Sequence, residues 1–162
     1  MLKRCWFVRG ALNELLEEAK RYRFRETGGA LPGWRDTEDV VVSRILGPGP
    51  CARHALSHFA PDHEWQGRQG RRIYWESGRR VAYVGDWHTH PRGSPRPSVQ
   101  DNNAMASIAK DADFRTPSPL SLIVSRPAKR SRSFKVFVWN GETLEPIDVE
   151  VFNATPLELA AS

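Results

Sequence analysis

The amino-acid sequence predicts a single α/β domain of the mixed α+β kind. Short β-type segments alternate along the chain with segments of helical periodicity. The chain has 162 residues, 40% of them hydrophobic and 27% charged, which suits one globular domain with a sizeable core. No repeat or low-complexity tract divides the chain. We therefore expect one domain over residues 1–152 and a loose tail over residues 153–162.

The N-terminal third of the chain predicts a strand, a helix and a second strand. Cys5–Val8 is a short apolar segment typical of a strand. Apolar residues then recur at helical spacing from Ala11 to about Arg25, and the Gly-Gly pair that follows should end this helix. Val40–Leu46 has the apolar, β-branched composition of a strand and precedes the turn-forming sequence Gly47–Pro50.

The middle of the chain predicts a helix, a strand, a loop and a second helix. Residues 61–77 start with Pro-Asp and end before a glycine, which suits a helix. Arg80–His90 has the composition of a strand. Pro91–Pro97 holds three prolines and a glycine, which excludes regular structure. Ser98 then opens a helix that runs to about Asp111.

The last third of the chain predicts three strands, at Leu120–Ser125, Ser133–Asn140 and Leu144–Phe152. The net charge of the chain is +5, but residues 126–135 carry five cations and no anion, whereas residues 141–162 carry five anions and no cation. We interpret the basic segment first as a solvated turn between two strands. Binding of nucleic acid or of an acidic protein is the alternative.

Membrane proteins and disulfide scaffolds are excluded by the composition. Apolar runs are too short for a membrane span, and the first residues lack the apolar stretch of about 7–15 residues that a signal peptide needs. We therefore expect a cytoplasmic protein. Cys5 and Cys51 lie far apart and form no CxxC pair, which also excludes a thiolate-rich zinc ribbon. Both are expected to be buried thiols, so any metal site must use histidine and carboxylate ligands.

Two histidines at the end of a predicted strand and an aspartate in the next helix have the spacing of a metal site. Side chains alternate faces along a strand, so His88 and His90 point to the same side. The chain turns back through Pro91–Pro97, and Asp101 lies in the first turn of the following helix. Two imidazoles and one carboxylate leave the fourth tetrahedral position open, which is typical of catalytic rather than structural zinc.

The spacing HxHx7SxxD is specific, because a chain of this composition would show it by chance about once in two thousand. The structural alternative is that Ser98 and Asp101 form a capping box and that His88 and His90 only end a strand. A hydrolase would also need a carboxylate as general base. Composition and spacing do not select it among the eleven glutamates. Glu26 is one candidate, because the glycines that follow allow close backbone approach.

Taken together, four segments resemble the JAMM, or MPN-plus, metalloprotease family, and more narrowly the stand-alone prokaryotic JAB-domain proteins. These segments are Glu26–Gly33 (ETGGALPG), Gly47–Pro50, Gly85–Pro91 (GDWHTHP) and Pro97–Asp101 (PSVQD). The resemblance covers roughly residues 5–140 and implies a cytidine-deaminase-like domain with a mixed central sheet flanked by helices. One departure is a proline at position 32, where the related sequences carry an apolar strand residue, which puts the local strand in doubt.

The resemblance implies a role for five residues. His88, His90 and Asp101 match the zinc ligands of the family. Glu26 matches the general acid/base that activates water, and Ser98 matches the residue that stabilises the oxyanion. No position of the family motif is missing, so an inactive scaffold is not expected.

The function implied by the resemblance is a zinc-dependent isopeptidase or peptidase. It would cleave after the C-terminal tail of a ubiquitin-like protein, or of a protein conjugated in the same way, in a bacterial anti-phage operon of the CBASS type with possible E1- and E2-like partners. Trimming of a sulfur-carrier protein is one alternative. A basic nucleic-acid or protein-binding module with incidental zinc is another, but it would not require Glu26 and Ser98, so nucleic acid is not the expected partner.

Two weaker patterns involve other residues. His54 and His58 are four residues apart and could share a helical face, but Ala55 stands where an HExxH zinc site requires glutamate. Cys51 lies near His54 in the sequence, which raises a thiol-protease alternative. Neither pattern is favoured.

Overall fold

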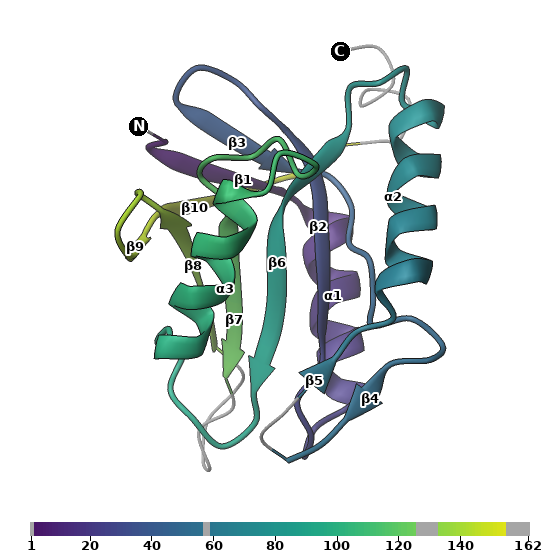
Figure 1. Cartoon of the computed structure of the whole chain (residues 1–162), viewed down its shortest axis with the longest axis vertical. Helices are drawn as coiled ribbons and strands as arrows, with labels where there is room; N and C mark the ends of the chain where they lie inside the picture. The colour runs from purple at the N-terminus through teal and green to yellow at the C-terminus, as the bar shows by residue number, and fades with distance from the viewer. Residues whose placement is uncertain (1, 57–58, 126–132, 155–162) are drawn as a thin grey trace.

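The computed structural model describes residues 2–56, 59–125 and 133–154 (Figure 1). No helix among these residues is both long and apolar enough to cross a membrane. The helices and strands are, in chain order, β1 (Arg4–Val8), α1 (Arg9–Arg21), β2 (Gly28–Arg35), β3 (Asp39–Val42), β4 (Arg53–His54), β5 (Phe59–Ala60), α2 (His63–Glu76), β6 (Ala82–His90), α3 (Val99–Lys110), β7 (Leu120–Ser125), β8 (Ser133–Trp139), β9 (Leu144–Pro146) and β10 (Asp148–Phe152).

A mixed sheet confirms the predicted α+β fold class. Within the described ranges, eight strands pair in the order β10-β1-β3-β2-β6-β7-β8-β9, and β4 and β5 form a separate hairpin. β1 runs parallel to β10 and β3, and β6 runs parallel to β7, whereas the other pairs are antiparallel. β6, which carries the two histidines, lies inside the sheet with both of its edges paired.

The C-terminal end of the sheet differs from the prediction. Leu144–Phe152 is expected as one strand but forms two, β9 and β10, which lie at opposite ends of the strand order. Only Ile147 separates them, and its N–H donates to the carbonyl of Val136 on β8 at 3.0 Å. Cα atoms two positions apart can be at most about 7 Å from each other. The sheet therefore curls until its two edges meet at Ile147.

The helices cover both faces of the sheet, with α3 in front and α1 behind in the view of Figure 1. The helical stripe of α1 is buried as predicted, at Ala11, Leu12, Leu15 and Ala19, and it packs in the larger apolar core. Met105 of α3 packs in a smaller cluster with Ile123, Phe137, Trp139 and Leu144. The predicted helix over residues 61–77 is α2, and the carboxylate of Asp62 caps it by accepting from the N–H of Trp65 at 3.0 Å.

Composition did not predict β2, nor the two short hairpin strands β4 and β5. α1 ends at Arg21 rather than near Arg25, and β2 begins at Gly28. The glycines of β2 concealed the strand from prediction, because glycine is disfavoured in strands. The close packing around β2 nevertheless requires glycine at these positions. A Cβ on Gly29 would lie 1.9 Å from the carbonyl oxygen of Leu46. Pro32 is accommodated because the pairing with β6 shifts register between Leu31 and Pro32.

Two smaller expectations are corrected. The predicted strand Val40–Leu46 is regular only as far as Val42, although Leu46 still donates its N–H to the carbonyl of Ala30 at 2.9 Å. Both cysteines are free thiols, but only Cys5 is buried, and desolvation raises the pKa of its thiol to about 12. Cys51 is exposed, because the segment that follows Gly47–Pro50 lies at the surface.

Candidate active site

His88 and His90 lie on the same face of β6, as strand alternation predicts. Their Nε2 atoms are 3.1 Å apart. Trp87 points to the opposite face, where it is 1% exposed and its Nε1–H donates to the carbonyl of Leu46 at 2.9 Å. The strand is therefore anchored beneath the two histidines by a buried and hydrogen-bonded indole.

The proline-containing loop after β6 orients the ring of His90. Nδ1 of His90 lies 3.0 Å from the carbonyl oxygen of Ser94. Because a carbonyl only accepts, Nδ1 carries the proton in this contact, and Nε2 of the neutral ring presents a lone pair. Metal-binding histidines are commonly held in this way by a carbonyl behind the ring.

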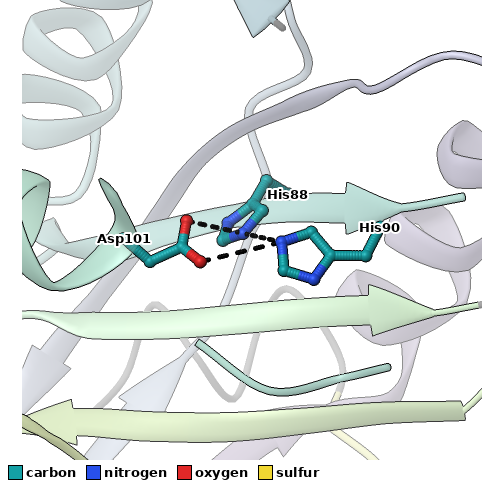
Figure 2. A group of neighbouring side chains, drawn as sticks. All are labelled: His88, His90 and Asp101. Carbon is teal, nitrogen blue, oxygen red and sulfur yellow. Dashed lines mark hydrogen bonds and ion pairs between the residues drawn. The ribbon is translucent and has the colours of Figure 1, made fainter. Parts of the chain in front are cut away.

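Asp101 reaches the histidines from the first turn of α3. Figure 2 shows the carboxylate facing both rings, with Oδ1 at 3.1 Å from Nε2 of His88 and Oδ2 at 3.7 Å from Nε2 of His90. Burial raises the pKa of Asp101, but the hydrogen bond and charge of His88, with the hydrogen bonds from Ser98, outweigh burial and hold that pKa below its usual range. The group is therefore a carboxylate rather than a carboxylic acid.

The three side chains fit a zinc ion. The ligand atoms of His88, His90 and Asp101 all lie within 4.8 Å of one another. Among the described residues, these three side chains form a group that could hold a metal ion, called here the metal-capable group. Two atoms bound to zinc at about 2.0–2.1 Å in a tetrahedron are about 3.4 Å apart, close to the separations observed here. Two imidazole nitrogens and one carboxylate oxygen are also a donor set that zinc accepts.

Asp86 is a further side chain on the histidine face that the sequence analysis missed. It lies two residues before His88 on β6. Burial raises the pKa of its carboxyl to about 6, against the opposing effects of the Tyr83 hydroxyl and of His88. The two-residue alternation that pairs His88 with His90 would also have found Asp86.

Glu26 lies at the end of β2 that meets the histidines. Gly28 is directly opposite His88 in the antiparallel pair, and the N–H of Thr89 donates to the carbonyl of Thr27 at 2.9 Å. Glu26 directly precedes Thr27 and lies just before β2, so the chain brings it close to the strand that carries the histidines. Glu26 is partly buried, and it is not one of the three side chains that form the metal-capable group. This placement suits a base that acts beside a metal without binding it.

Ser98 forms the capping box that the structural alternative predicted. Its hydroxyl accepts from the N–H of Asp101 at 3.1 Å and donates to Oδ2 of Asp101 at 2.7 Å, and the N–H of Ser98 donates to the same oxygen at 2.6 Å. Asp101 therefore takes part in both the N-terminal cap of α3 and the metal-capable group. A role of the hydroxyl toward an oxyanion stays a prediction.

The two roles of Ser98 can be separated by substitution. In Ser98→Ala we expect the free energy of unfolding to fall by about 1 kcal/mol, because the N-cap is lost, whereas Ser98→Gly should lose only a few tenths. If the hydroxyl also stabilises an oxyanion, both variants should lower kcat by about 10²-fold. Chemical denaturation and steady-state kinetics measure the two effects. Full kcat in the glycine variant would leave Ser98 with the cap alone.

The weaker sequence patterns do not form a second site in the described part of the chain. His54 lies on a strand, β4, and not on a helix, and His58 lies outside the described residues. Cys51 is exposed, and its N–H donates to Asp62 at 3.2 Å. Most of the basic segment, residues 126–132, is also outside the described ranges.

Comparison with known proteins identifies the class of protein that this fold and site define. A model of prokaryotic homologs of the JAB domain matches residues 8–137. The chain therefore belongs to the prokaryotic JAB domain family, and it is a peptidase of that family.

Two relatives carry names that agree with this class. "Probable metalloprotease y4qB" of Sinorhizobium fredii is 33% identical over 76% of this chain and 77% of its own length. A "CD-NTase/cGAS isopeptidase" of Enterobacter hormaechei is 31% identical over 78% of this chain and 70% of its own length. The solution structure of protein DSY2949 from Desulfitobacterium hafniense has the same fold, with a TM-score of 0.73 at 22% identity over 96% of this chain and 97% of that one.

Proposed function

We propose that this protein is a zinc-dependent isopeptidase, with His88, His90 and Asp101 as metal ligands. The observation that carries the proposal is the convergence of these three side chains on one point, with no fourth protein ligand among the described residues. A site with three protein ligands leaves room for water or substrate, as in catalytic zinc sites. Glu26 at the adjoining end of β2 supports hydrolysis rather than a purely structural metal.

In this proposal Glu26 moves the proton. A zinc ion in this site would lower the pKa of a bound water to about 7 and polarise the carbonyl of the scissile bond. The carboxylate of Glu26 accepts a proton from the attacking water and later donates it to the nitrogen of the departing amine. A C–O bond forms and the C–N bond breaks, so the products are a carboxylate and an amine. The hydroxyl of Ser98 donates toward the oxygen of the former carbonyl.

We further propose that the substrate is the C-terminal tail of a conjugated protein, either a ubiquitin-like protein or an enzyme of the CD-NTase/cGAS kind after which the Enterobacter hormaechei relative is named. An extended tail can pair with a strand edge through its backbone, so that little side-chain contact is needed. The cellular setting that we propose is the cytoplasm of a bacterium, in an anti-phage operon with E1- and E2-like partners.

Fusion proteins test this function. Each fusion joins a candidate ubiquitin-like or nucleotidyltransferase C-terminus to a reporter, through a peptide bond in one set and a lysine isopeptide bond in the other. We expect the zinc-loaded protein to release the reporter at the last residue of the tail, and cleavage to stop when a chelator removes the metal and to return when zinc is added. Intact-mass measurement locates the cleaved bond. Cleavage that persists in chelator, or the absence of cleavage with every tail, would contradict the proposal.

A further inference from the structure

The β4–β5 hairpin holds both backbone polar groups of Glu26. The N–H of Glu26 donates to the carbonyl of Ala55 at 2.9 Å. On the other side of the same residue, Nδ1 of His54 lies 3.0 Å from the carbonyl oxygen of Glu26. Figure 1 places this hairpin at the end of the sheet where β2 begins and β6 ends. The backbone of Glu26 is thus hydrogen-bonded to a hairpin that is separate from both β2 and β6.

The imidazole of His54 is itself in contact with two aromatic rings. It stacks on Tyr22, with ring centroids 3.9 Å apart and an angle of 13° between the planes, and it packs against Phe59 at 5.3 Å. Tyr22 is the C-cap residue, directly after the end of α1 at Arg21. The stacking limits rotation of the imidazole, so its nitrogen stays directed at the carbonyl of Glu26.

The contact also determines which nitrogen of His54 carries a proton. The carbonyl of Glu26 has no proton to donate, so Nδ1 must be the donor. Replacement by phenylalanine would keep an aromatic ring in contact with Tyr22 and Phe59 but remove this donor. Replacement by asparagine would remove the ring but can present an N–H near the position of Nδ1.

We propose that His54 is a positioning residue for catalysis, which orients the carboxylate of Glu26 by holding its backbone carbonyl. This inference rests on the proposed function, because it needs Glu26 to be the base. Glu26 lies between α1 and β2, outside regular structure, so its backbone depends on such contacts for its position. A displacement of about 1 Å of a catalytic group can cost about 10²-fold in rate. His54 acts through Glu26 and touches neither metal ligand nor substrate in this proposal.

Kinetics of two substitutions test the proposal. We expect His54→Phe to lower kcat by about 10–100-fold, with KM and zinc stoichiometry unchanged, and His54→Asn to recover most of the lost kcat. In the Glu26→Gln background, His54→Phe should have no further effect on kcat, because the group that it positions is already disabled. Wild-type kcat in His54→Phe, or an equal loss in both backgrounds, would overturn the proposal.

The tautomer of His54 gives a readout that does not depend on activity. A long-range proton–nitrogen NMR spectrum of the wild-type protein should show His54 protonated at Nδ1, with and without zinc. A proton on Nε2 alone would overturn the proposal even if His54→Phe failed to fold. Failure of the proposed function is recognised separately, because the wild type would then cleave none of the fusions or would cleave them equally well in chelator. Failure of the role of Glu26 would show as wild-type cleavage by Glu26→Gln.

Discussion

Glu26→Gln should lower cleavage by about 10²–10⁴-fold while the protein still binds one zinc ion. Glutamine has nearly the same shape as glutamate but cannot accept the proton of the attacking water. Metal binding should survive because Glu26 is not among the three side chains that converge, which are His88, His90 and Asp101. The measurements are kcat/KM on a fusion that the wild type cleaves and zinc content by elemental analysis.

The matched control for Glu26→Gln is Glu64→Gln. Glu64 is an exposed glutamate of α2 that pairs with Arg68 and is not part of the metal-capable group, so this change removes the same charge at the surface. We expect Glu64→Gln to retain wild-type cleavage. Full cleavage by Glu26→Gln would show that another group moves the proton.

Asp101→Asn should remove zinc and with it the activity. The substitution keeps the size of the side chain but takes away the negative charge that faces His88 and His90. Loss of a partner behind a metal ligand already costs about 10–100-fold in metal affinity, so loss of the ligand itself should cost more. Competition with a chromophoric chelator measures the affinity, and fusion cleavage should fall to the level of the zinc-free protein.

The aspartate that caps the C-terminal end of the same helix provides the control for Asp101→Asn. Asp111 is the exposed residue at the C-terminal end of α3, so Asp111→Asn changes the charge of the helix without touching the candidate site. It should bind zinc and cleave as the wild type does. Wild-type zinc affinity in Asp101→Asn would mean that Asp101 serves only the capping box with Ser98.

Much of the candidate site follows from local sequence. The same-side placement of His88 and His90 depends only on the alternation of a strand, and Ser98 begins α3 because serine is a good N-cap. The role proposed for Glu26 required a resemblance, since the glycines that follow it made it only one candidate among the eleven glutamates. His54 appeared in the sequence only as a weak metal candidate, whereas its contact with Glu26 depends on a hairpin formed 28 residues away.

The sequence by itself determined the order of most helices and strands, the face shared by the histidines and the helix start that carries Asp101. These are short-range properties, set by side-chain period and capping within a few residues. Only the tertiary structure decided that glycine-rich β2 is a strand, that Ile147 divides the last strand between two sheet edges, and that the backbone of Glu26 is hydrogen-bonded to the β4–β5 hairpin. Such features arise from contacts between segments that are far apart in the chain. No local sequence pattern predicts that these segments lie close together in the fold.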